Sequence, residues 1–131
     1  MNMKIASVSI LCIGLALPLG AAAEDFSLGY EVDRVPAAQL SVQACNAAIG
    51  RGAAALGYVV RANQDQKTLS LHVSGPRQEG RSLVAYCIAA GNHTAWVVQA
   101  FDYSGPGLSE PGVIAKKVAG EIRKAIKPAA R

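Results

Sequence analysis

Hydrophobic and polar residues alternate along several stretches of the chain and recur every three or four residues in two others. Alternation predicts β-strands, whereas the longer spacing predicts amphipathic helices. The predicted strands cover residues 26–33, 58–63, 68–74, 82–89 and 94–103. One predicted helix runs between Ser41, a suitable N-cap, and Gly57, a suitable stop. The other follows Ser109 and ends before Pro128.

These elements follow one another in the order β-α-β-β-β-β-α. Strands grouped between two amphipathic helices predict an α+β two-layer sandwich with a mostly antiparallel sheet. We expect both helices on one face of this sheet, because each carries a single apolar stripe. The stripes comprise Val42, Cys45, Ile49, Gly52 and Leu56 in the first helix and Ile114, Val118, Ile122 and Ala125 in the second.

The strands on either side of Gly91-Asn92 predict a hairpin whose register stays open. A two-residue turn pairs Cys87 with Trp96, whereas a slip of one residue exposes Trp96 and buries Val97. Both registers leave aromatic and branched side chains on the face without helices, which is typical of a contact surface. A solvated sheet, or one covered by the loop after Asp102, is the alternative. The predicted contact face comprises Val84, Tyr86, Ile88 and Phe101.

The amino-terminal segment has the three parts of a secretory signal peptide. Lys4 is followed by the apolar run Ile5–Leu17, which is too short to span a bilayer, and then by the small residues Ala21–Ala23. We therefore expect cleavage after Ala23 and a single α+β domain over residues 24–131 in the periplasm, with no transmembrane segment. An uncleaved membrane anchor is the alternative.

Three cysteines occur, and Cys12 leaves with the predicted signal peptide. The remaining pair, Cys45 and Cys87, predicts a disulfide in an oxidising compartment. Two free thiols or a labile redox switch are the alternatives. Because the chain contains no Cys-x-x-Cys motif, a thioredoxin-like site is disfavoured.

Composition and motifs argue against most catalytic classes. A length of 131 residues excludes a multidomain enzyme, and a net charge of +4 on an exported protein does not indicate nucleic-acid binding. The two histidines, His72 and His93, stand in no metal-ligand spacing, and no phosphate-binding or nucleophile motif occurs. We therefore expect no catalytic residue, no metal and no cofactor.

The cations of the last helix are typical of a solvated face, with an anionic surface or partner as the alternative.

Several segments together resemble a known family. They are the exported start, the Phe26-x-Leu28 strand, Pro-Ala-Ala-Gln-Leu-Ser-Val-Gln-Ala-Cys45, a Ser-Gly-Pro loop, Tyr86-Cys87-Ile88 and Val-Val-Gln-Ala-Phe-Asp-Tyr103. The chain resembles a family of small exported bacterial proteins, domain of unknown function 6180. The resemblance implies a bacterial, periplasmic protein, and the family has no established activity or site residues.

The sequence therefore favours a small non-catalytic periplasmic protein that binds an envelope protein, or a copy of itself, through the open sheet face. One alternative is an inhibitor of an envelope enzyme such as a lysozyme, with loops at Ser74-Gly75-Pro76 and Ser104-Gly105-Pro106 as its contact. A carrier with a small-molecule pocket between sheet and helices is another. An enzyme is the least favoured, because few ionisable groups converge.

Overall fold

The fold has the predicted order of helices and strands. The computed structural model describes residues 26–75, 80–105 and 108–129, so the predicted signal peptide and parts of two loops lie outside the described residues. Its elements are β1 (Ser27–Pro36), α1 (Val42–Ala55), β2 (Val60–Asp65), β3 (Leu69–Ser74), β4 (Arg81–Ala90), β5 (His93–Asp102) and α2 (Glu110–Ala125).

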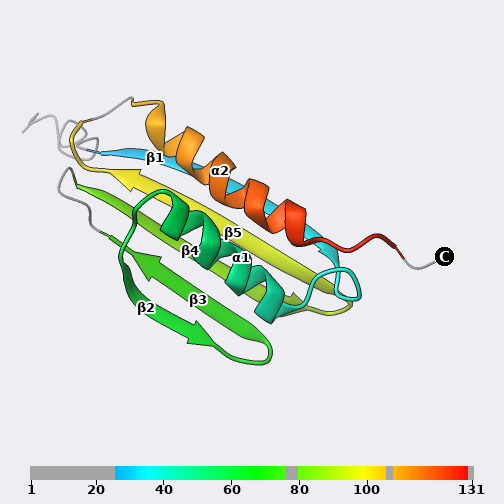
Figure 1. Cartoon of the computed structure of the whole chain (residues 1–131). Coiled ribbons are helices and arrows are strands. Elements are labelled where there is room, and N and C mark those ends of the chain that lie inside the picture. Colours follow the sequence, from blue (N-terminus) through cyan, green and yellow to red (C-terminus); the bar gives the residue numbers. More distant parts are fainter. Residues whose placement is uncertain (1–25, 76–79, 106–107, 130–131) are drawn as a thin grey trace, which may run out of the picture.

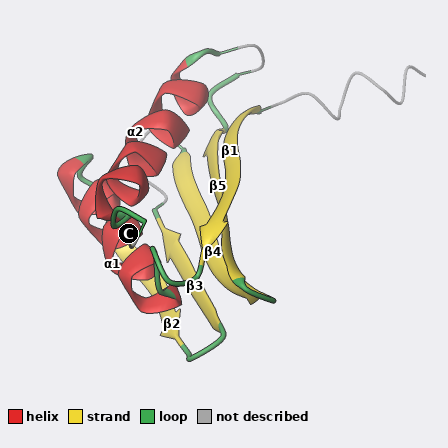
Figure 2. Ribbon diagram, turned by 90° about the vertical axis from the view of Figure 1, so that its right-hand side faces the viewer, coloured by secondary structure: helices red, strands yellow, loops and turns green. Residues whose placement is uncertain are grey.

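The five strands form one antiparallel sheet in the order β1-β5-β4-β3-β2. Both helices cover the same face of this sheet, and the other face carries no helix (Figures 1 and 2). Helix α2 lies over β1 and β5, whereas α1 lies over β3 and β4. The two-layer α+β sandwich predicted from the sequence is therefore confirmed.

The ends of α1 follow the expected local chemistry. The side-chain oxygen of Ser41 accepts a hydrogen bond of 3.0 Å from the backbone N–H of Ala44, so Ser41 is the N-cap. Gly57, two residues beyond the last helical residue, has a φ of +78°. This left-handed conformation suits glycine and ends the helix.

Several strand boundaries differ from the prediction by one to three residues, and β1 extends to Pro36. Strand β2 begins at Val60 rather than Tyr58, because the Tyr58 side chain is buried in the core instead of continuing the strand. Helix α2 begins at Glu110, directly after Ser109 as predicted, with Pro111 in its first turn. Ser109 precedes α2, but its side chain makes no capping hydrogen bond.

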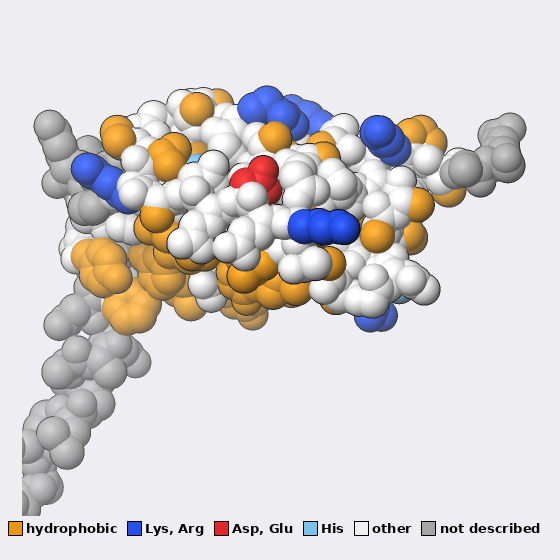
Figure 3. Space-filling view, turned by 90° about the horizontal axis from the view of Figure 1, so that it is seen from below, with side chains coloured by type: hydrophobic (Ala, Val, Ile, Leu, Met, Phe, Trp, Pro, Cys, Tyr) orange, Lys and Arg blue, Asp and Glu red, His pale blue; other side chains and the backbone are white. Residues whose placement is uncertain are grey.

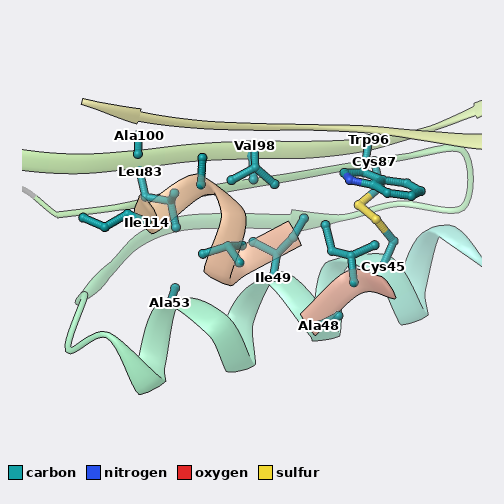
Figure 4. Packing of buried hydrophobic residues seen from close by; sticks show 14 of the residues in the cluster. Cys45, Ala48, Ile49, Ala53, Leu83, Cys87, Trp96, Val98, Ala100 and Ile114 are labelled. Atoms are coloured by element: carbon teal, nitrogen blue, oxygen red, sulfur yellow. A yellow bond between two sulfur atoms is a disulfide. The ribbon is translucent and has the colours of Figure 1, made fainter. Parts of the chain in front are cut away.

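The core lies between the helices and the sheet and is centred on the hairpin of β4 and β5 (Figure 4). Cys87 pairs with Trp96 across this hairpin, so the register with the two-residue turn is confirmed and the slipped register is wrong. A disulfide joins Cys87 to Cys45 of α1, with 6.3 Å between the two Cα atoms. It links the first helix to the central strand of the sheet.

Candidate functional site

The sheet face opposite the helices carries side chains from all five strands, arranged in four rows across the sheet. The strand pairing defines these rows, and we call them together the sheet face. From one end of the sheet to the other, they are Leu28-Phe101-Ser82, Tyr30-Gln99-Val84-Val73-Ala62, Val32-Val97-Tyr86-Leu71-Gln64 and Arg34-Ala95-Ile88-Leu69.

All four residues predicted for the contact face lie on it. Ile88 is exposed, whereas Val84, Tyr86 and Phe101 are half-buried because neighbouring rows flank them. Within the four rows, the most exposed apolar side chains belong instead to β1: Tyr30 is 66% and Val32 58% exposed. The alternation in residues 26–33 was visible in the sequence, but nothing local indicated that β1 pairs with β5.

An aromatic cluster closes one end of the sheet face. The ring of Phe26 lies 6.3 Å from that of Phe101 and 5.7 Å from that of Tyr103, measured between ring centroids. Phe101 and Tyr103 are stacked at 6.4 Å. Because Phe26 and Tyr103 are both exposed, this end presents a large apolar surface.

Formal charge is nearly absent from the four rows. Arg34 is their one charged side chain among the described strand residues, and it stands at the end of β1 away from the aromatic cluster. Figure 3 views the molecule from the β2 edge, and hydrophobic side chains gather along its lower border, on the side away from the helices. A continuous apolar face without scattered charges is unusual for a solvated sheet.

The polar side of β3 points inward, under the helices. Ser70, His72 and Ser74 are at most 1% exposed, and Asn46 of α1 is 6% exposed. Four of their polar atoms have no hydrogen-bond partner within the described residues: Asn46 Oδ1, Ser70 Oγ, His72 Nε2 and Ser74 Oγ. Burial lowers the pKa of His72, which keeps its imidazole neutral near pH 7. This inward polar strip leaves the apolar residues of β3 on the sheet face.

The two Ser-Gly-Pro loops of the inhibitor hypothesis follow β3 and β5, and these two strands finish at the same end of the sheet. At this end of the sheet, the Nε of Arg81 lies 3.3 Å from a carboxylate oxygen of Asp102. An Nη atom of Arg81 lies 2.7 Å from a carboxylate oxygen of Glu110. Hydrogen bonds from the hydroxyl and backbone N–H of Ser104 lower the pKa of Asp102. Residues 76–79 and 106–107 of the loops lie outside the described residues.

The described residues assemble no metal site: none of their His, Cys, Asp and Glu side chains gather in threes that could hold an ion. His93 is half-buried at the start of β5, far along the sheet from Asp102 at the other end of the same strand.

A family model matches the whole described part of the chain. The model of a family of unknown function, DUF6180, matches residues 25–131. The chain belongs to this family. The match covers every described helix and strand, including both cysteines of the disulfide, but a family of unknown function supplies no activity. No curated protein matches the chain.

The helix layer of this DUF6180 protein carries charged side chains that form ion pairs, unlike the mostly apolar sheet face. Lys124 forms an ion pair of 3.0 Å with Glu121, and Arg123 one of 3.4 Å with Glu31 of β1.

A cavity of about 490 Å³ opens between the helices, lined by Gly52, Ala55, Leu56, Lys117, Gly120, Glu121 and Lys124. The carrier hypothesis placed a pocket between sheet and helices, whereas this cavity lies between the two helices. Among the described helices, neither is long and apolar enough to cross a membrane.

Proposed function

We propose that this DUF6180 protein is a small non-catalytic protein of the bacterial periplasm that acts by association through its sheet face. The observation that carries the proposal is the set of four cross-strand rows, in which most side chains are apolar and a single one, Arg34 at one end, is charged. Leaving such a face in water is unfavourable by about 25 cal/mol for each Å² of apolar surface. A partner that covers the face removes this cost.

The shape of the face supports a macromolecular partner. A small-molecule site is normally concave and encloses most of its ligand. The sheet face instead spans five strands, with its most exposed side chains at one margin, on β1. Aromatic residues such as Tyr30 and Phe101 are the side chains that most often anchor protein interfaces.

The proposed location rests on the amino-terminal segment and the disulfide. A buried disulfide between Cys45 and Cys87 suits an oxidising compartment. If the segment is a signal peptide, protein recovered from the periplasm has the intact mass of residues 24–131 with two hydrogens fewer than its reduced form. A full-length species held in the inner membrane contradicts this location.

Photo-cross-linking in the native host tests the association itself. The photoreactive residue p-benzoylphenylalanine replaces Tyr30 on the sheet face or, as the control, Val113 on α2, which is 47% exposed. We expect covalent adducts from position 30 and few or none from position 113. If irradiation yields no adduct at position 30, or equal yields at both positions, the sheet face is not an association surface.

A further inference from the structure

We propose that the occupant of the sheet face is a second copy of this chain, packed face to face about a twofold axis that runs across the strands. This inference rests on the proposed function and names the partner. The two sheets then lie about 10 Å apart as a β-sandwich, with a helix layer outside each of them.

The area of the face suits such a dimer. Five strands give a width of about 24 Å and four rows a length of about 27 Å. Side chains fill 17 of the 20 positions in this area, so the footprint is about 550 Å². A stable interface buries about 800 Å² of each partner. The sheet face therefore supplies about two-thirds of a standard interface, and the exposed rings of Phe26 and Tyr103 extend it at one end.

The chemistry of the face suits a copy of itself. In a twofold dimer the same patch lies on both sides, so every charge in the middle of the patch meets a like charge nearby. The two central rows contain apolar side chains and the neutral amides Gln99 and Gln64. Stacking them against their own copy brings no like charges together.

The two ends of the face fix the direction of the axis. Arg34 and the cluster of Phe26, Phe101 and Tyr103 stand at opposite ends, and the rows of Arg34 and Leu28 are about 20 Å apart along β1. An axis across the strands places the Arg34 end of one copy over the aromatic end of the other, twice per dimer. A guanidinium over an aromatic ring is attractive. An axis along the strands would instead place each Arg34 over the β2 margin of the other copy, away from the aromatic cluster.

Sedimentation of the purified protein tests the dimer. We expect wild-type protein to sediment at twice the chain mass, with dissociation on dilution. Val32→Glu on the sheet face and Val113→Glu on α2 are matched variants, because the two valines are 58% and 47% exposed. Each Val32→Glu dimer carries two new charges, so its dissociation constant should rise at least about a hundredfold, about tenfold for each charge. Val113→Glu should change it less than about threefold.

Tyr86→Glu provides a second variant at the centre of the face. It should likewise raise the dissociation constant of the dimer, while circular dichroism shows a folded protein, because Tyr86 is only half-buried. If Tyr86→Glu unfolds, the Val32→Glu comparison still decides. Wild-type protein at single-chain mass up to its solubility limit, or a dimer that Val113→Glu dissociates and Val32→Glu does not, overturns the proposal.

Cross-link mapping on the purified dimer tests the axis. With p-benzoylphenylalanine at position 34, the intermolecular adduct should map to peptides that contain Phe26 or Tyr103. An adduct near position 34 of the other copy contradicts the axis. If purified protein is monomeric but position 30 cross-links a different protein in cells, the second copy is wrong and the association function stands.

Discussion

The backbone of Gly29 in β1 touches the backbone of Gly112 in the first turn of α2. A Cβ atom on Gly29 would lie 2.2 Å from the Gly112 nitrogen and 2.3 Å from the Pro111 carbonyl oxygen. Both contacts are with backbone, which cannot move aside as the tip of a side chain can. The lack of a side chain on the inward side of β1 thus sets how closely α2 approaches the sheet.

We expect Gly29→Ala to destabilise the protein by about 1–3 kcal/mol, because the start of α2 must shift to admit the methyl group. Gly50→Ala is the matched control: Gly50 lies inside α1, and a Cβ there meets nothing within 4 Å. Alanine in a helix should stabilise by about 1 kcal/mol. Urea denaturation measures both, and equal effects of the two changes would contradict the close contact.

Loss of the disulfide should lower the free energy of unfolding. The bond closes a loop with a sequence separation of 42 residues. Closing such a loop stabilises the fold by about 4 kcal/mol, because the bond restricts the conformations of the unfolded chain. The double variant Cys45→Ala/Cys87→Ala should therefore lose about this much in guanidinium denaturation, and reductant should lower the wild-type midpoint but not that of the variant. An unchanged midpoint in the variant would show that the bond does not form.

Burial of His72 should make the fold sensitive to mild acid. Its folded pKa lies below the ordinary value of 6.5, so the unfolded chain binds the proton more readily. Stability should then fall as pH drops from about 7 through 6.5 towards the lowered pKa, and level off below it. His72→Gln should remove this slope, whereas His93→Gln should keep it. Thermal denaturation between pH 5 and about 7.5 provides the measurement.

The carboxylate of Asp102 should contribute to stability only when it is ionised. Its folded pKa is below the ordinary 3.8, chiefly because Ser104 donates hydrogen bonds to it. This contribution is present in full above about pH 4 and is lost as pH falls through the lowered folded pKa. Asp102→Asn should unfold more easily at pH 6 and show a shallower acid transition, while Glu110→Gln should keep the wild-type acid slope. Identical acid profiles for wild type and Asp102→Asn would contradict this role.

Local patterns predicted most of the fold because the relevant chemistry is local. Ser41 and Gly57 bound the first helix through backbone groups a few residues away, and the turn at Gly91-Asn92 sets the Cys87–Trp96 pairing. A two-residue turn permits no slip once Trp96 must be buried, so the hairpin follows from its own residues.

The local sequence pattern did not predict how elements that are distant in the sequence pack against one another. Which neighbour β1 takes depends on strand pairing across about seventy residues of chain, for which the alternation in residues 26–33 carries no signal. In β3 the pattern separates Leu69, Leu71 and Val73 from Ser70 and His72 but does not say which set faces the helices. The structure buries the polar set, the reverse of the usual arrangement, and this reversal extends the sheet face across β3.

The two outer strands determine how large any assembly of this protein can become. An unprotected sheet edge invites another strand to pair with it and leads to open-ended aggregates. Strand β2 carries an irregularity between Val60 and Ala62 and the charged residues Arg61 and Asp65, while β1 carries Glu31, Asp33 and Arg34 and ends at Pro36. These features discourage edge-to-edge growth, so the proposed association through the sheet face should stop at a closed pair instead of propagating into a fibre.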